Sequence, residues 1–197
     1  MKRRLFFGLE LPGSWKDEIA ERCASIRQQG QVVARNWSRK EMYHLTVLFL
    51  GDVDSADLDR AFLAGARAAG QQAPFRLTTG PFGRFLQSRV FWLGLDEVEC
   101  NLAELTALYR RVRAATEEAL PSVRLEDRPY RPHITLAREL RHYAEPELVA
   151  PKPMSHEFTE LCLFESTRES GQLAYPIIRR FPFSGASVIR TPEGRGR

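Results

Sequence analysis

Cysteine is scarce in this sequence, and long apolar runs are missing. The three cysteines, Cys23, Cys100 and Cys162, lie far apart and form no Cys-x-x-Cys motif. Their spacing predicts neither a disulfide framework nor a zinc site. No run reaches the roughly 18 apolar residues of a membrane span, and the first residues lead straight into a strand-like segment. We therefore expect a cytoplasmic protein with neither a membrane span nor a signal peptide.

Lysine is almost as scarce, although the net charge is +4. Of the 29 basic residues only four are lysines, and the others are arginines. An arginine-rich surface suits an anionic partner, because the planar guanidinium binds phosphate through two hydrogen bonds. A coding bias towards arginine is the simpler explanation of this count, so composition alone does not predict a nucleic-acid partner.

Histidine is also rare, yet two of the four histidines stand in a repeated motif. His-x-Thr occurs at His44 and Thr46 and again at His133 and Thr135. With four histidines and nine threonines in 197 residues, chance would give about 0.2 such motifs. A candidate amphipathic helix precedes each motif by a similar distance, which indicates an internal duplication.

Both motif segments are rich in apolar, β-branched and aromatic residues, which predicts β-strands. Successive side chains of a strand point to opposite faces, so the histidine and the threonine of each motif share one face. The residues between and after them point into a core: Leu45, Val47, Ile134 and Leu136. Two imidazoles and two hydroxyls are then left to line a surface.

Hydrophobic periodicity along the rest of the chain predicts an α+β fold with helices over mostly antiparallel sheet. The expected strands, besides the two motif strands, are residues 4–11, 32–37, 75–85, 89–95, 157–166 and 172–183, and the expected helices are residues 14–29, 55–70 and 101–120. Gly80-Pro81 predicts a bend or bulge inside its strand, and residues 168–171 predict a hairpin turn. Residues 141–155, with three prolines and little periodicity, predict a surface loop.

Duplicated halves predict a bilobal arrangement. A pseudo-twofold pair of mostly antiparallel sheets would line a central cleft, with helices on the outside and the two motif strands facing each other. We expect residues 1–184 to form this single domain and residues 185–197 to form a disordered basic tail.

The sequence resembles the two-histidine (2H) phosphoesterases, specifically the 2′-5′ RNA ligase-like RNA 2′,3′-cyclic phosphodiesterases of bacteria and archaea. The resemblance covers all but the tail, and the two His-x-Thr motifs are its specific part. It implies a bilobal α+β fold with a central cleft, in agreement with the expectations above. The segments that carry it are Leu5–Pro12, Trp37, His44–Gly51, Ser88–Gly94, Arg128–Arg138 and the strand around Tyr175.

The resemblance also implies the roles of the site residues. His44 and His133 are the expected catalytic residues, and the expected substrate-binding residues are Thr46, Thr135, Arg138, Tyr130 and Phe49. Members of the family use the fifth residue after each motif histidine, here Phe49 and Arg138, to hold the base and the phosphate. Strict alternation would send both side chains away from the histidine face. We therefore expect a twist or bulge after each motif threonine.

These residues suffice for opening a 2′,3′-cyclic phosphate with water. The reaction needs a base, an acid and donors for the phosphoryl oxygens. By resemblance, His44 is the acid towards O3′ and His133 the base towards water, which leaves a 2′-phosphate. No metal or cofactor is required. The expected partners are RNA ends or nucleotides bearing a 2′,3′-cyclic phosphate, with no membrane, and the protein is expected to be a monomer.

Three alternatives compete with this interpretation. An ATP-dependent ligase needs a lysine in a Lys-x-Asp-Gly context, which none of the lysines has, so ligation is expected only as the reverse reaction. A non-catalytic nucleotide or RNA binder could use the same cleft. A histidine metal site lacks nearby ligands, since Asp52 and Asp127 lie six or more positions from the motif histidines.

Overall fold

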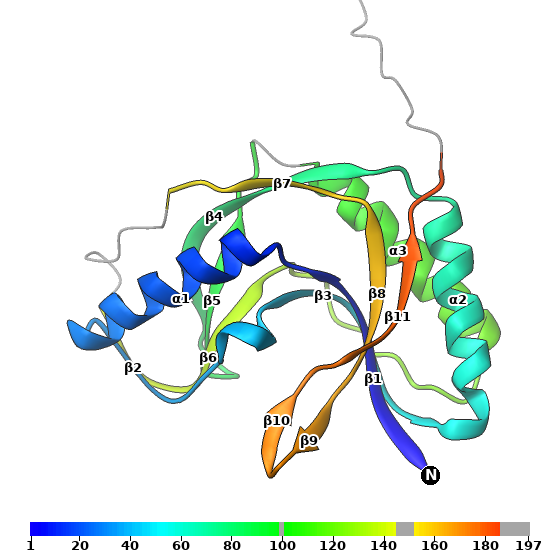
Figure 1. The fold of residues 1–197 in the computed structure, drawn as a ribbon, viewed down its shortest axis with the longest axis horizontal. Helices are drawn as coiled ribbons and strands as arrows, with labels where there is room; N and C mark the ends of the chain where they lie inside the picture. The colour runs from blue at the N-terminus through cyan, green and yellow to red at the C-terminus, as the bar shows by residue number, and fades with distance from the viewer. Residues whose placement is uncertain (99–100, 145–151, 186–197) are drawn as a thin grey trace, which may run out of the picture.

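Antiparallel pairing joins nine of the described strands into one curved sheet, and two further strands pair only with each other as a hairpin (Figure 1). The computed structural model describes residues 1–98, 101–144 and 152–185. The strands are β1 (Lys2–Glu10), β2 (Val32–Trp37), β3 (His44–Asp54), β4 (Phe75–Phe85), β5 (Val90–Leu95), β6 (Ile134–Tyr143), β7 (Ser155–Phe158), β8 (Glu160–Glu165), β9 (Thr167–Glu169), β10 (Gln172–Ala174) and β11 (Ile177–Pro182). The helices are α1 (Gly13–Gln28), α2 (Leu58–Gly70) and α3 (Leu102–Ala119), with short 3-10 turns at Lys40–Met42 and Ser55–Asp57.

The order of strands in the sheet is β11-β8-β1-β3-β6-β5-β4-β7, and β2 also pairs with β6. The α+β class and the antiparallel pairing are therefore confirmed. Where the sequence predicts two sheets, hydrogen bonds connect the two halves at β3 and β6 through a single residue pair, Leu45 with Ile134. Both residues belong to the motif segments. The two motifs thus lie side by side at the junction between the halves.

The helices cover the sheet from outside. Figure 1 shows α2 and α3 packed together against one part of the sheet, with α2 over β8 and β11, and α1 across another part. In α1, Trp15 makes an edge-on contact with Phe158 of β7. No helix among residues 1–98, 101–144 and 152–185 is long and apolar enough to cross a membrane.

The central strand β1 is buried on both faces. Leu5, Phe7 and Leu9 belong to the main hydrophobic core. Phe6, which alternation places on the opposite face, is 1% exposed and forms a second, smaller cluster with Phe164. The apolar residues of the two motifs face the main core as predicted: Leu45, Val47, Ile134 and Leu136 are each at most 1% exposed.

Several boundaries differ from the prediction. The expected strand 157–166 is divided into β7 and β8, and the expected strand 172–183 is divided into β10 and β11, and the pieces pair with different strands. Strand β6 continues through Tyr143, inside the expected loop, because β2 pairs alongside it as far as the contact of Val32 with Tyr143. His133 lies immediately before β6 instead of within it. The preceding residue, Pro132, has no N–H to donate, which disfavours an earlier start of the ladder. Residues 145–151 of the expected loop and residues 186–197 of the expected tail lie outside the described residues.

Gly8 of β1 permits the close approach of β1 and β3 beneath the motif strand. A Cβ atom at this position would lie 2.8 Å from the backbone oxygen of Leu45 and 3.2 Å from the ring of Phe164. A backbone oxygen in a paired strand cannot move away at low cost. We expect Gly8→Ala to lower the free energy of unfolding by roughly 1–3 kcal/mol, as overpacking does. Gly13→Ala is the control, since nothing lies within 4 Å of its added Cβ. Equal denaturation midpoints for the two variants would contradict this account of the packing.

Candidate active site

The two motif histidines are oriented by the same backbone device. Nδ1 of His44 lies 2.7 Å from the carbonyl oxygen of Met42, and Nδ1 of His133 lies 2.7 Å from that of Arg131. A carbonyl oxygen only accepts hydrogen bonds, so Nδ1 is the protonated nitrogen in each neutral ring. Nε2 is left as the reactive nitrogen. The identical contact to the residue two positions earlier supports the predicted duplication.

A bulge follows the first motif. The pairing of β3 with β1 skips Val47, which lies between the paired residues Thr46 and Leu48. Val47 and Leu48 are both buried, whereas Phe49 is 48% exposed. The extra residue changes the phase of the alternation and returns Phe49 to the face that carries the motif side chains. The expected bulge after Thr46 is confirmed.

A matching bulge follows the second motif. The pairing of β6 with β5 skips Leu136, which lies between the paired residues Thr135 and Ala137. Leu136 and Ala137 are both buried, and Arg138 is exposed. The charge of Arg138 acts to lower the pKa of both motif histidines, so its guanidinium lies within electrostatic range of the two rings. Arg138 thus occupies the position that the sequence predicts for it.

Aromatic rings surround His44. Its ring centroid lies 4.8 Å from that of Phe6, 5.6 Å from that of Phe164 and 5.2 Å from that of Tyr175, which meets it edge-on. Phe6 also lies 5.5 Å from Phe49, so the cluster continues onto the exposed ring. The residue as a whole is half-buried, and these rings shield part of the imidazole from water.

This burial lowers the pKa of His44 to about 4. The carbonyl of Met42 acts in the opposite direction, and the charges of His133, Arg138 and Lys16 lower the pKa further. The hydroxyl of Thr46 lies 3.0 Å from Nε2. His44 is therefore neutral at pH 7 in the free protein, with the lone pair of Nε2 accepting a hydrogen bond from this hydroxyl.

His133 has a similar but smaller aromatic wall. Phe85 meets its ring edge-on at 4.8 Å, and Trp92, the register partner of Thr135, lies 5.3 Å from Phe85. Burial lowers the pKa of His133, and the charge of Arg138 adds to the effect. Thr135 is half-buried. Both halves of the site thus pair an imidazole with a nearby hydroxyl-bearing residue and an aromatic wall.

Tyr130 lies differently from the other expected substrate-binding residues. Its hydroxyl donates a hydrogen bond to the backbone oxygen of Thr46 at 3.0 Å, and its ring stacks on Tyr109 at 4.4 Å. Burial raises the pKa of this hydroxyl. In this structure Tyr130 connects the segment before the second motif to the backbone of the first one.

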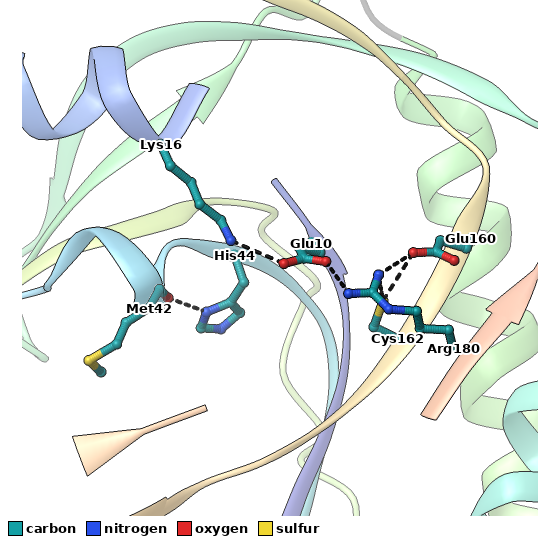
Figure 2. Close-up of polar contacts among 7 residues, drawn as sticks. All are labelled: Glu10, Lys16, Met42, His44, Glu160, Cys162 and Arg180. Carbon is teal, nitrogen blue, oxygen red and sulfur yellow. Dashed lines mark hydrogen bonds and ion pairs between the residues drawn. The ribbon is translucent and has the colours of Figure 1, made fainter. Parts of the chain in front are cut away.

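A chain of four charged side chains lies beside His44 (Figure 2). Lys16 of α1 contacts Glu10 of β1 at 3.2 Å, and Glu10 contacts Arg180 of β11 at 2.5 Å. Arg180 also forms an ion pair with Glu160 of β8. Glu10 is the register partner of His44. Three of the four charged residues, Lys16, Glu10 and Arg180, line a pocket of about 240 Å³ together with His44 and Tyr175.

Sequence reasoning did not select several of these neighbours. Phe6, Phe85 and Tyr175 contact a motif histidine, and Lys16 acts on one through its charge. They come from separate segments with no shared motif. The alternation of β1 places Phe6 away from the main core, and the strand around Tyr175 is part of the family resemblance, but neither observation assigns these side chains to the site. No group of three or more histidine, cysteine or acidic side chains that could hold a metal ion occurs within the described part of the chain.

Known proteins are similar to this chain in sequence and in fold. A family model described as the 2′-5′ RNA ligase superfamily matches residues 15–169. An RNA 2′,3′-cyclic phosphodiesterase of Escherichia coli is 33% identical over 186 residues, which is 91% of this chain and 96% of that protein. A protein of the same name from Geobacillus stearothermophilus is 35% identical over 173 residues, 83% of this chain. The present chain spans only about half of the Geobacillus protein, because the match covers 52% of it.

Solved structures agree with the sequence relatives. The crystal structure of E. coli LigT complexed with 3′-AMP matches with a TM-score of 0.79 and 27% identity, covering 93% of this chain and 99% of that one. A crystal structure from Thermus thermophilus matches with a TM-score of 0.74 and 25% identity, covering 93% of this chain and 100% of that one. From the family match over most of its length, together with these relatives, the chain belongs to the 2′-5′ RNA ligase superfamily.

Proposed function

We propose that this protein hydrolyses the 2′,3′-cyclic phosphate of RNA ends or nucleotides to a 2′-phosphomonoester, without a metal ion. The observation that carries the proposal is the pair of histidines whose Nδ1 atoms are held by backbone carbonyls. Each keeps Nε2 for proton transfer. Relatives named RNA 2′,3′-cyclic phosphodiesterase, at 33% and 35% identity, support the same activity.

The proposed reaction divides between the two halves of the site. Nε2 of His133 takes a proton from water as the water oxygen attacks phosphorus, and Nε2 of His44 gives a proton to O3′ as the P–O3′ bond breaks. The product is the 2′-phosphate. Arg138, with the hydroxyls of Thr46 and Thr135, holds the non-bridging oxygens, and the exposed ring of Phe49 offers a surface on which the base stacks.

His44 must gain its proton as the substrate binds. In the free protein its pKa is about 4, because burial disfavours the charged ring. An anionic phosphate next to the ring favours the charged form and raises the pKa. Substrate binding and proton uptake by His44 are therefore coupled in this proposal. Without substrate, only a small fraction of the protein has His44 protonated.

Two related activities follow from the same groups. Attack by a 5′-hydroxyl in place of water would join two RNA ends through a 2′-5′ bond, with the histidines in the same roles. Hydrolysis is ranked first, because water is abundant and opening the strained ring is downhill. The alternative from a different class is a nucleotide or RNA binder that uses the same surface without catalysis.

The first test separates proton transfer from phosphate binding. With 2′,3′-cyclic AMP in EDTA, we expect His44→Ala and His133→Ala to lower kcat about 10²- to 10⁴-fold with little change in KM. Arg138→Ala should mainly raise KM, since its phosphate contact already exists in the ground state. His142→Ala is the matched control, because His142 is exposed and lies on the same motif strand. If both histidine variants kept the wild-type kcat, the two histidines would not be the catalytic acid and base, and the non-catalytic nucleotide or RNA binder would become the better interpretation.

The second test uses pH. Both histidine pKa values lie below 6.5 in the free protein, that of His44 at about 4. Protonated His44, the acid, is therefore lost as the pH rises above this range. Neutral His133, the base, is lost as the pH falls through it. We expect a bell-shaped kcat/KM with its maximum below pH 6.5, and a kcat maximum at higher pH because the bound anion raises the histidine pKa. Profiles that are flat between pH 5 and 8 would rule out this acid–base pair.

The third test assigns the acid. A cyclic substrate with sulfur in place of O3′ releases a thiolate, whose conjugate acid has a pKa near 8.5, so its departure needs no proton donor. We expect this substrate to restore most of the kcat lost in His44→Ala and little of that lost in His133→Ala. Rescue of His133→Ala alone would reverse the two roles.

A further inference from the structure

Arg4 stands on the site face of β1, beyond the aromatic cluster. Alternation places Arg4 and Phe6 on one face of the strand, while Leu5 and Phe7 point into the main core. The ring of Phe6 lies 4.8 Å from that of His44. Two residues of strand advance the chain by about 7 Å. Arg4 is thus one strand step further from the motif histidines than Phe6.

The guanidinium of Arg4 is exposed and open to a ligand. The neighbouring Arg3 forms a two-pronged ion pair with Glu165, with contacts of 2.5 and 3.0 Å. Among the residues that the structure describes, none forms an ion pair with Arg4. Its register partner on β3 is Asp52, and even these two do not come within ion-pair distance. Arg4 therefore makes no ion pair that stabilises the fold, in contrast to Arg3.

Electrostatics connect Arg4 to the site. Burial raises the pKa of the Tyr175 hydroxyl, and the charges of Arg138 and Arg4 both act to lower it. Tyr175 is thus within electrostatic range of both guanidiniums, and its ring contacts that of His44. Arg138, Tyr175 and Arg4 therefore mark a path across the site face, from the motif histidines towards the start of β1.

The β9–β10 hairpin borders this path. Figure 1 shows it projecting from the body of the protein next to β1, and Tyr175 follows directly after it. Arg39 fixes the hairpin by donating to the side-chain oxygen of Gln172 at 2.7 Å and to the backbone oxygen of Leu173 at 2.6 Å. Arg39 belongs to the turn just before the first motif. The position of the hairpin is thus tied to that of His44.

A mononucleotide has no group for Arg4 to bind. Its single cyclic phosphate lies between the motif histidines in the proposed function, where Arg138 contacts it. An RNA end carries another phosphodiester on the 5′ side of its terminal nucleoside. An open arginine fork is suited to such a group, which carries one negative charge and two free oxygens.

We propose that Arg4 binds the phosphodiester on the 5′ side of the terminal nucleotide, and that RNA ends are thereby preferred over mononucleotides. This inference rests on the proposed function and deepens it by naming the substrate class. The terminal base stacks at Phe49, and the strand leaves the site over the start of β1. Asp52 beside Arg4 reduces its attraction for anions, so the preference is moderate.

The experiment compares two substrates that differ by one phosphodiester. One is 2′,3′-cyclic AMP, and the other is the dinucleotide ApA with a terminal 2′,3′-cyclic phosphate. For the wild type, kcat/KM should be higher with the dinucleotide. In Arg4→Ala the ratio of the two kcat/KM values should fall about tenfold, the size of one exposed charge-assisted contact. The salt dependence of kcat/KM with the dinucleotide should lose about 0.7 of logarithmic slope.

Lys2→Ala is the matched control. Lys2 is exposed, lies on the same face of β1 and carries the same charge, but it is two residues further from the site. We expect its ratio to equal that of the wild type, because Lys2 lies too far from the site to contact the phosphodiester. Both variants remove one positive charge from the same face, so a loss seen only in Arg4→Ala reports a direct contact. Arg4→Lys should restore part of the preference.

The outcomes separate the two proposals. A wild-type ratio in Arg4→Ala, or an equal loss in Lys2→Ala, would overturn the assignment of Arg4 while leaving cyclic phosphate hydrolysis in place. Failure of the wild type to hydrolyse either substrate would overturn the proposed function itself. Equal denaturation midpoints for the wild type and both variants would exclude unfolding as the cause of any loss.

Discussion

One extra residue in each motif strand determines what this protein presents to a substrate. In a regular strand the fifth residue after a histidine points to the opposite face. Because Val47 and Leu136 are skipped in the pairing, Phe49 and Arg138 return to the histidine face. The bulges also require two consecutive apolar residues after each threonine, and both pairs are buried. The core and the site are therefore specified by the same short segments, and neither segment could lose its bulge without exposing core residues and burying site residues.

A second condition is the partial burial of the two histidine rings. Aromatic rings on β1, β8 and the segment after β10 enclose one imidazole, and rings on β4 and β5 border the other. The same burial that keeps the rings neutral strengthens any interaction they make with a bound anion, because the local dielectric is low. The ion pairs beside His44 hold two positive and two negative side chains in place, so their charges balance one another.

The sequence specifies the local features of this fold well and the distant ones poorly. The His-x-Thr repeat, the strand alternation and the turn residues predict most elements, because each depends on neighbours in the chain. The bulges after the motif threonines are expected only from the family resemblance, since strict alternation would send Phe49 and Arg138 away from the histidine face. The junction at Leu45 and Ile134 could not be predicted, since either sheet half could satisfy its own hydrogen bonds alone. The wall around His44 joins Phe6, Phe164 and Tyr175, which lie more than 150 residues apart at the extremes. The ring stacking of Tyr130 and its bond to the Thr46 carbonyl could not be predicted either, because they depend on α3 and β3 packing together.

The groups that orient the histidines belong to the main chain. Every amino acid carries a carbonyl oxygen, so substitution at positions 42 and 131 leaves the acceptor in place as long as the backbone keeps its path. The two halves already illustrate this freedom, because one uses a methionine and the other an arginine for the same hydrogen bond at the same distance. A site built in this way tolerates sequence drift next to its most important residues. Relatives can therefore differ at the positions before each histidine without any change in the tautomer that the ring presents.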